Sequence, residues 1–301
     1  MTSVVYQQVQ KTYTMKKQEE TITSRELKPF GFSKAFKEII QGLDTNVQVG
    51  ILSGFETIDQ ITDGRQKQQL TLIASLSGLG KTSLMAMFAQ NAIKSNVPTL
   101  IFNFETSATH LYLRMICTEA KVELKQAKIG QMTTEELAAF NLHRRLLRQR
   151  PLMIDDSSRL SLSGLKTKIL RSKEKYGVQL VCIDFMRYIQ TNKQAFESRQ
   201  AELAYVSSEL KQIANELQVA IIAVVQLYRS LALEKRAPCL ADLEATKNAD
   251  TVLFLHRSPE ASQGVTELII AKDKAKPTNV IIPLRFIGKY TYFESLENSE
   301  G

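Results

Sequence analysis

Short, uninterrupted apolar runs recur along this chain and alternate with stretches of helical periodicity. The runs that predict buried strands in the first part are Leu70–Ala74, Thr99–Phe104, Leu152–Ile154, Gln179–Asp184 and Val219–Val225. Because continuous apolar runs are typical of strands covered on both faces, they predict an α/β fold with a mostly parallel central sheet flanked by helices. The later runs follow one another without a helical stretch and predict an antiparallel C-terminal extension at Thr251–Leu255, Thr266–Ala271, Val280–Phe286 and Tyr290–Phe293.

Helical periodicity and end signals predict the helices between these strands. Thr133 and Glu136 have the spacing of a capping box, and Gly177 is suited to end a helix. The predicted helices are Lys81–Gln90, a helix capped by Ser107, Thr133–Arg148, Leu162–Tyr176, and a helix with an apolar stripe at Leu203, Val206, Leu210, Ile213 and Leu217.

The first part of the chain differs in composition from the rest. Residues 1–28 are polar and charged, which predicts a mobile arm. Ser33–Gly42 predicts a short amphipathic helix, which needs a partner surface on its own domain or elsewhere because a helix this short is unstable alone. We therefore expect residues 1–49 to form an arm with a linker helix and residues 50–296 to form one globular domain.

Composition narrows the functional classes. The 301 residues contain 39 Lys and Arg against 31 Asp and Glu, a formal charge of +8 that favours a polyanionic partner. Three scattered cysteines and three isolated histidines predict neither a disulfide framework nor a zinc site, and suit a reducing cytosol. No apolar run reaches the length of a membrane span, so we expect no membrane association.

The stretch from Leu70 to Thr82 has the layout of a phosphate-binding loop, with a strand, a loop of small residues, Lys-Thr and a helix. Small residues let successive backbone N–H groups turn toward a phosphate, and the helix directs its positive end at the same anion. Lys81 supplies charge for the β- and γ-phosphates, and the Thr82 hydroxyl is placed to ligate Mg²⁺. The predicted ATP-binding residues are Ser75 (where the full motif has glycine), Ser77, Gly78, Leu79, Gly80, Lys81, Thr82 and Ser83.

Polar residues end the other predicted strands. Glu105 follows the second strand, Asp184 ends the fourth and Gln226 follows the fifth. Because the carboxyl ends of parallel strands meet at one edge of a sheet, we expect these side chains to surround the phosphate loop. Asp184 is the predicted second acid at Mg²⁺, Glu105 the general base and Gln226 a sensor of the γ-phosphate. A single acid at a strand end is also typical of an ordinary exposed loop, so the prediction rests on the combination.

Phe185 separates two classes of ATPase. In typical AAA+ ATPases, including helicase loaders, a glutamate directly follows the Walker B aspartate, whereas here Phe185 follows Asp184. The candidate glutamate, Glu105, instead ends the neighbouring predicted strand. This is the RecA-like arrangement.

From about Gly50 to Phe293 the sequence resembles the C-terminal motor domain of the DnaB-type replicative DNA helicases. The segments that carry the resemblance are Leu76–Thr82, Phe102–Thr106, Cys182–Phe185, Glu197–Leu203, Leu217–Ile222, Gln226–Arg229, Asp242–Leu243, Asn248–Thr251 and Lys272–Lys274. The resemblance implies a RecA-like P-loop NTPase fold, a six-membered ring and single-stranded DNA in a central channel. It also implies a helicase loader or primase as partner, and a cytoplasmic protein, or a stromal one if a plastid encodes it.

The same resemblance implies an active site between subunits. Lys272 and Lys274 are expected to reach the nucleotide bound by the next subunit, since beyond Lys81 no obvious cation lies near the phosphate loop in sequence. Lys274 has the place of the family's finger arginine, and it keeps the charge but lacks the planar fork that grips phosphate oxygens. The Ser33–Gly42 helix has the place of the family's linker helix, which docks on the adjacent subunit.

Two regions differ from the family pattern. We expect the chain to lack the family's N-terminal helical domain, because only the arm and the short helix precede Gly50. After Leu243 the loop is shorter than in the family, and Glu244–Asn248 replaces the arginine and glycines that hold DNA there. Lys247 and Arg229 are the remaining predicted DNA contacts.

These residues leave three functions open. The favoured one is a ring-forming, ATP-hydrolysing DNA helicase or translocase of the DnaB type. A second is an ATP-binding regulatory paralogue that joins or modulates a helicase ring without unwinding, which Lys274 and the altered loop favour. A third is a RecA- or RadA-like recombination ATPase, which would form a filament on DNA rather than a closed ring.

Overall fold

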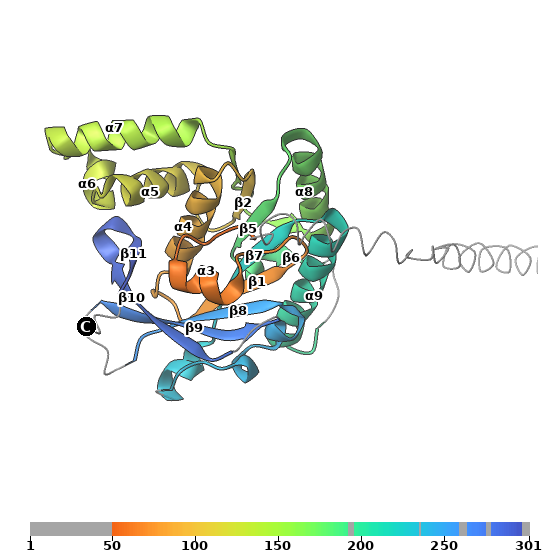
Figure 1. Cartoon of the computed structure of the whole chain (residues 1–301). Helices are drawn as coiled ribbons and strands as arrows, with labels where there is room; N and C mark the ends of the chain where they lie inside the picture. The colour runs from red at the N-terminus through yellow and green to blue at the C-terminus, as the bar shows by residue number, and fades with distance from the viewer. Residues whose placement is uncertain (1–49, 192–195, 235, 259–263, 275–277, 297–301) are drawn as a thin grey trace, which may run out of the picture. The chain divides into compact units, whose positions relative to one another are not determined.

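A mixed sheet forms the centre of the fold, and the computed structural model describes it within residues 50–191, 196–234, 236–258, 264–274 and 278–296. The nine strands follow the order β11-β10-β9-β8-β1-β7-β5-β2-β3 (Figure 1). The parallel strands are β1 (Leu70–Ser75), β2 (Thr99–Asn103), β3 (Leu152–Asp155), β5 (Leu180–Asp184), β7 (Ala220–Gln226) and β8 (Thr251–His256). The antiparallel strands are β9 (Val265–Asp273), β10 (Val280–Ile287) and β11 (Tyr292–Ser295).

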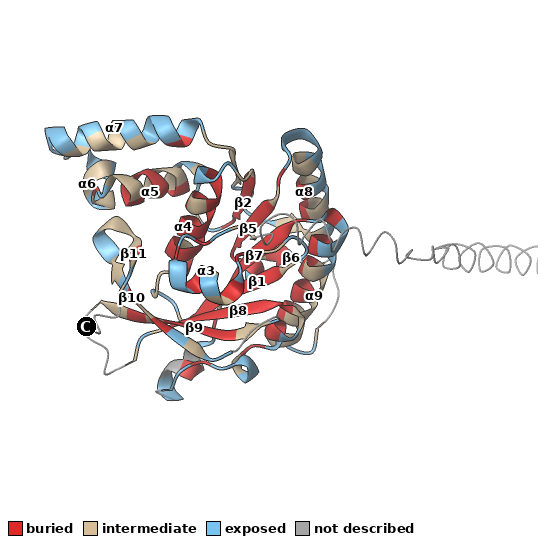
Figure 2. Ribbon diagram, in the orientation of Figure 1, coloured by how far each residue is buried: buried red, intermediate tan, exposed pale blue. Residues whose placement is uncertain are grey.

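Two layers of helices cover the two faces of this sheet. Because side chains alternate between the faces along a strand, Leu72 and Ala74 of β1 belong to one hydrophobic cluster and Ile73 to the other. The first cluster joins the sheet to α8 (Leu162–Tyr176) and α9 (Arg199–Leu217). The second joins it to α3 (Glu56–Thr62), α4 (Lys81–Lys94), α5 (Ala108–Ala120) and α7 (Thr134–Arg148). Figure 2 shows the strands buried between these layers and α7 largely exposed.

Short elements complete the described fold. They are α6 (Leu124–Ile129), the 3₁₀ helices η1 (Met186–Tyr188), η2 (Arg229–Glu234), η3 (Leu240–Asp242), η4 (Glu244–Asn248) and η5 (Gly288–Tyr290), and the two-residue strands β4 (Leu160–Ser161) and β6 (Ile189–Gln190). β4 and β6 pair with each other in parallel, apart from the main sheet. No described helix is both long enough and apolar enough to cross a membrane.

The predicted fold class is confirmed, and the predicted strands all occur with ends that differ by one or two residues. Local end signals also act as expected. Ser107 accepts a hydrogen bond from the His110 N–H, and Thr133 and Glu136 form both bonds of the capping box. The sequence reasoning did not predict α3, α6, β4, β6 or the 3₁₀ helices, which are too short to show a periodic pattern.

The described chain begins where the sheet domain begins. The Gly50 N–H donates to the Asp63 carbonyl at 2.8 Å, and Ile51 and Arg65 form an isolated bridge, so this segment closes onto the loop before β1. The predicted arm and the predicted Ser33–Gly42 helix lie outside the described residues, and both stay predictions.

Candidate active site

The phosphate loop connects the carboxyl end of β1 to the start of α4. Gly78 and Gly80 have φ of 83° and 90°, in the left-handed region that glycine adopts readily. At Gly80 a second constraint applies, because a Cβ built there would lie 2.8 Å from Cζ of Phe293. The loop therefore has the backbone that the small residues of the sequence predict, and its N–H groups lead into the positive end of α4.

Lys81 is the first residue of α4, and its side chain returns over the loop. The residue is only 4% exposed, and its Nζ donates to the Leu76 carbonyl at 2.7 Å, to Ser75 Oγ at 3.1 Å and to the Ser75 carbonyl at 3.2 Å. Burial lowers the pKa of the ammonium to about 8, while the charges of Asp184 and Glu105 oppose that shift. Lys81 thus carries a proton at neutral pH and lies where a bound phosphate would replace the loop carbonyls.

Asp184 ends β5 and is 1% exposed. Burial raises the pKa of its carboxyl to about 6, whereas a hydrogen bond with Thr82 and the charges of Arg114 and Lys81 lower it. Oδ1 of Asp184 is buried and has no hydrogen-bond partner among the described residues. A buried, unpartnered carboxylate oxygen beside a hydroxyl is the donor set that Mg²⁺ accepts, since this ion takes one or two protein oxygens and completes its shell with phosphate and water. The residues present therefore fit Mg²⁺.

No larger metal site competes with this pair. Among the residues that the structure describes, no three His, Cys, Asp or Glu side chains gather in a way that would hold a metal ion. This agrees with the sequence, in which the histidines and cysteines are scattered.

Glu105 follows β2 directly and is exposed. Asn103 and Asp184 are register partners in β2 and β5, which brings Glu105 to the same edge of the sheet as Asp184. The charge of Glu105 acts on Lys81 and Asp184. Asn103 stabilises the turn after β2, because its Nδ2 donates to the Thr106 carbonyl at 2.7 Å. An exposed carboxylate at this edge has the access to water that a general base needs.

Gln226 ends β7 and lies opposite Ser75 in the register of β1 and β7. The next residue, Leu227, donates its N–H to the Ser75 carbonyl at 2.9 Å. Gln226 is half-buried, so its amide is available at the edge where the phosphate loop begins. The structure thus brings Lys81, Thr82, Glu105, Asp184 and Gln226 to one edge of one sheet.

Two arginines join this edge that the sequence reasoning missed. Arg114 of α5 interacts electrostatically with Asp184 and Glu105, and burial lowers the pKa of its guanidinium, whose Nε is buried without a partner among the described residues. Arg187 of η1 lies over the Phe185 ring, 5.6 Å from its centroid, and its charge lowers the pKa of Lys81. The expectation that Lys81 is the only obvious cation here was therefore wrong. The available signal was an arginine in the mostly apolar helix that begins just after Glu105.

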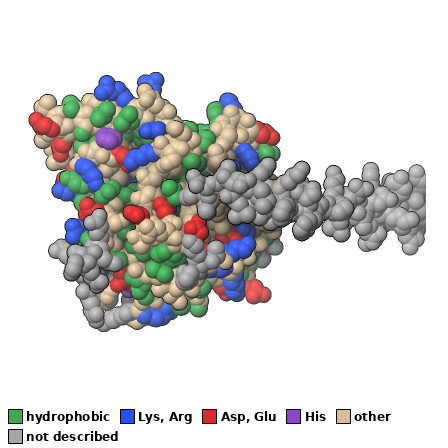
Figure 3. Space-filling model, in the orientation of Figure 1, with side chains coloured by type: hydrophobic (Ala, Val, Ile, Leu, Met, Phe, Trp, Pro, Cys, Tyr) green, Lys and Arg blue, Asp and Glu red, His purple; other side chains and the backbone are tan. Residues whose placement is uncertain are grey.

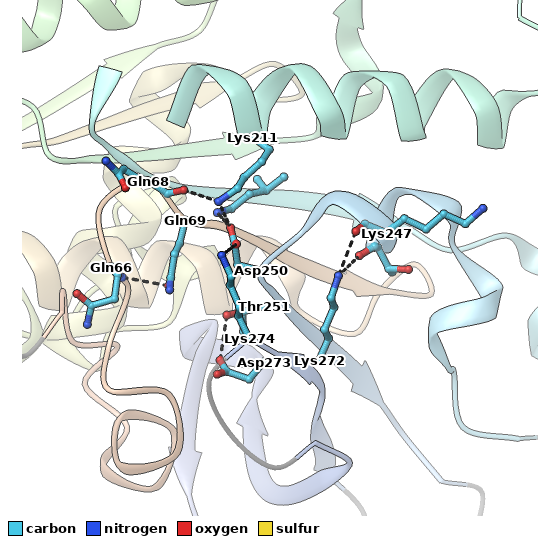
Figure 4. A network of polar contacts seen from close by, with 12 residues as sticks. Gln66, Gln68, Gln69, Lys211, Lys247, Asp250, Thr251, Lys272, Asp273 and Lys274 are labelled. Atoms are coloured by element: carbon cyan, nitrogen blue, oxygen red, sulfur yellow. Dashed lines mark hydrogen bonds and ion pairs between the residues drawn. The ribbon is translucent and has the colours of Figure 1, made fainter. Parts of the chain in front are cut away.

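Lys272 and Lys274 lie at the opposite edge of the sheet (Figure 4). β9 runs antiparallel to β8, so Asp273 pairs with Thr251, the first residue of β8, while the N–H of Asp250 donates to the carbonyl of Leu70, the first residue of β1. The phosphate loop follows the other end of β1. Within one chain the structure does not bring these lysines to the phosphate loop.

The predicted DNA contacts are only partly described. Lys247 is exposed in η4, and the Lys272 Nζ donates to the Lys247 carbonyl at 3.1 Å and to the Thr246 carbonyl at 2.9 Å. The side chain of Arg229 lies outside the described residues. On the face that Figure 3 shows, Lys and Arg groups lie over several elements and are interspersed with acidic groups rather than forming one continuous patch.

Comparisons with known proteins agree on one family. The family model described as the DnaB-like helicase C terminal domain matches residues 50–295. A replicative DNA helicase DnaB of Geobacillus stearothermophilus is 31% identical over 287 residues, which are 89% of this chain and 63% of that protein. A replicative DNA helicase DnaC of Bacillus subtilis is 31% identical over 259 residues, which are 82% of this chain and 57% of that protein. The chain thus spans less than two thirds of the length of these relatives.

Solved structures show the same fold. One solved structure, described by its title as an ATPase domain, matches with a TM-score of 0.82 and 25% identity, over 90% of this chain and 100% of that one. The structure of a DnaB-like replicative helicase described with its primase interactions matches with a TM-score of 0.79 and 24% identity, over 94% of this chain and 71% of that one, and supports the fold alone. From the family model, these relatives and the shared RecA-like fold it follows that this chain belongs to the DnaB-like helicase C-terminal domain family.

Proposed function

We propose that this chain is the ATP-hydrolysing motor of a DnaB-type DNA helicase, which moves along single-stranded DNA as a ring during DNA replication. The observation that carries the proposal is the separation of charges between the two edges of one sheet. The carboxyl edge holds Lys81, Asp184 and Glu105, and the amino edge holds Lys272 and Lys274.

Nucleotide binding follows from the first edge. The N–H groups of the phosphate loop and the ammonium of Lys81 bind the β- and γ-phosphates. Thr82 and Asp184 would hold Mg²⁺, whose charge offsets the negative charge that the phosphates carry. The unpartnered Oδ1 of Asp184 supports this role, because a buried carboxylate oxygen without a donor is costly unless a ligand engages it.

Hydrolysis needs a water directed at the γ-phosphate. Glu105 is the general base, since it is exposed and at the same edge as Asp184 and Lys81. Gln226 is placed beside the start of the phosphate loop, where its amide would detect the γ-phosphate. Arg114, with a buried Nε that has no described partner, adds positive charge beside both acids.

Assembly follows from the two edges together. A subunit whose lysines lie on the edge away from its own phosphate loop can supply them only to another subunit. Such a contact is head-to-tail, and a head-to-tail contact closes into a ring when the rotation between subunits allows it. A hexamer is the ring we propose, with Lys274 as the cation that acts in trans.

The polymer in the ring is single-stranded DNA. The two curated relatives are named replicative DNA helicases, and the net charge of +8 favours a polyanion. Lys247 is an exposed residue of the loop that follows Leu243 and is a candidate contact with the DNA backbone. A helicase loader or a primase is the further partner, and the place of action is the cytoplasm, or the stroma if a plastid encodes the chain.

A second function rests on one residue. Lys274 cannot grip phosphate with the planar fork of an arginine, which favours an ATP-binding regulatory paralogue that joins a ring without unwinding. The two functions share the fold and the nucleotide site, so only activity separates them.

Mixed assemblies test the proposal directly. Lys81→Ala should lose hydrolysis because its phosphate loop fails, and Lys274→Ala should lose it because the trans cation is absent. In an equal mixture about one quarter of random interfaces pair an intact phosphate loop with an intact Lys274. ATPase activity should therefore return when the two proteins are mixed.

The control for this mixture is Lys125→Ala, which removes an exposed lysine of α6 and should remain active alone. A mixture that forms rings by electron microscopy but regains no ATPase activity would contradict the trans role of Lys274.

A further inference from the structure

Asp250 lies where the amino ends of β1 and β8 meet α9 (Figure 4). Only 5% of the residue is exposed. Its backbone N–H donates to the Leu70 carbonyl at 2.9 Å, and its Oδ2 accepts the Leu70 N–H at 2.8 Å. Two bonds to one residue fix the carboxylate firmly at the start of β1.

The two oxygens of Asp250 have different partners. Oδ2 also accepts a hydrogen bond from Lys211 Nζ at 2.7 Å, and the same ammonium donates to the Gln68 carbonyl at 2.7 Å. Oδ1 faces Lys274, whose Nζ is 4.0 Å away. One side of the carboxylate is therefore used inside the domain, and the other side faces a lysine at the surface.

Strand register, rather than chance, places Lys274 beside Asp250. β8 and β9 are antiparallel with Thr251 opposite Asp273. Asp250 precedes Thr251 and Lys274 follows Asp273, so both residues extend the same rung of the sheet by one position. The hydrogen bond from Thr251 Oγ1 to Asp273 Oδ2, at 3.1 Å, stabilises that rung.

The contact is suited to direct Lys274 and to release it. The Lys274 side chain is 73% exposed whereas that of Asp250 is 6% exposed. Ion pairs with an exposed partner are weak because water screens them, and Lys211 already offsets much of the Asp250 charge. A triphosphate on another subunit carries more negative charge than this shared carboxylate and would win the ammonium from it.

Lys272 shows the contrast. Two residues earlier on the same strand, its Nζ donates to the Thr246 and Lys247 carbonyls at 2.9 and 3.1 Å. Two hydrogen bonds within its own chain hold Lys272, whereas Lys274 has the single long contact to Asp250. Of the two lysines, Lys274 is the one that leaves its own domain at smaller cost.

We propose that Asp250 is a positioning residue for Lys274, holding its ammonium at the amino edge of the sheet until a nucleotide bound by the next subunit takes it. The inference rests on the proposed trans role of Lys274. It assigns to a buried aspartate, fixed to β1 and α9, the task of limiting where a long exposed side chain points.

The placement of one substitution in mixed assemblies tests this inference. The parent mixture contains Lys81→Ala subunits, which supply only Lys274, and Lys274→Ala subunits, which supply only a phosphate loop. Asp250→Asn is then added to one partner at a time. Placed in the Lys81→Ala subunit, it should lower the restored ATPase activity about tenfold, as misplacement of a reacting group does. Placed in the Lys274→Ala subunit, it should change the activity less than about twofold.

Other patterns would overturn the inference. Loss only with the Lys274→Ala subunit would mean that Asp250 acts through β1 on its own phosphate loop. Equal loss in both placements would mean a general structural role, and no loss in either would mean no role. A parent mixture without restored activity would contradict the trans role of Lys274 itself, and the inference would fall with it.

A matched control and a second variant complete the test. Glu267→Gln removes a half-buried carboxylate of β9 far along the strand from Lys274 and should leave both placements unchanged. If Asp250→Asn does not fold, Asp250→Glu keeps the charge and moves it by one methylene. Its loss should again occur only in the subunit that supplies Lys274, and loss in the other placement would contradict the inference.

Discussion

The Phe293 ring of β11 lies against the backbone of Gly80 at the start of α4. A Cβ built on Gly80 would be 2.8 Å from Phe293 Cζ and 3.2 Å from Phe286 Cε2. The two rings contact each other, with their centroids 4.6 Å apart. The antiparallel extension of the sheet therefore packs directly on the phosphate loop, so the last described strand contributes to the shape of the first functional element.

This contact makes Gly80 more sensitive than Gly78. Both have positive φ, but a Cβ at Gly78 would meet no atom within 4 Å. Gly80→Ala should lower the free energy of unfolding by more than Gly78→Ala, whose cost is backbone strain alone, about 1 kcal/mol. Urea unfolding followed by circular dichroism measures both variants. Equal losses would contradict the contact between Phe293 and the loop.

Glu105 and Asp184 should differ in the kind of defect they cause. Glu105→Gln should keep ATP binding but lower turnover by ~10²-fold or more, because a general base is lost. Asp184→Asn should instead shift the Mg²⁺ concentration that ATPase activity requires, because a metal ligand is lost. Steady-state ATPase assays over a Mg²⁺ series separate the two. Normal turnover in Glu105→Gln would assign the water to another residue.

Lys247 should contribute to DNA affinity without sequence preference. If its ammonium neutralises one phosphate, Lys247→Ala should weaken binding to single-stranded DNA similarly for every sequence and reduce the salt slope by about one. Fluorescence anisotropy over a salt series measures both quantities. Lys125→Ala of α6 is the control, and an equal effect of the two variants would argue against a specific contact in η4.

Asp242 gives a stability difference that depends on pH. Bidentate hydrogen bonds from Arg236, at 2.6 and 2.8 Å, lower the pKa of the Asp242 carboxyl to about 2, below its ordinary value of 3.8. Because the folded-state pKa is depressed, the stability that Asp242 contributes is present above about pH 4 and is lost as pH falls toward 2. Thermal unfolding of wild type and Asp242→Asn should therefore differ at pH 5 and converge near pH 2. A difference that does not change with pH would contradict the ion pair.

The strong signals in the sequence predicted the parts of the structure that depend on neighbours in the chain. The apolar runs, the capping residues Ser107 and Thr133, and the stripe from Leu203 to Leu217 each express a local preference, and each appears as expected. The edge shared by Glu105 and Asp184 also followed, because parallel strands bring their carboxyl ends together.

The remaining features depend on contacts between distant residues. No local pattern predicts that the Phe293 ring lies against Gly80, or that Arg114 lies with a buried, unpartnered Nε beside two acids. The register of β8 and β9 likewise decides that Lys274 lies beside Asp250, and register is a property of paired strands rather than of one segment. These features became visible only with the fold.

A forked-duplex unwinding assay with ATP, run beside a DNA-stimulated ATPase assay, tests the central claim most directly. The full chain should unwind the fork, its ATPase activity should rise with single-stranded DNA, and Lys81→Ala should lose both activities. ATP binding without unwinding, in rings that form on DNA, would contradict the proposed helicase function and support the regulatory paralogue.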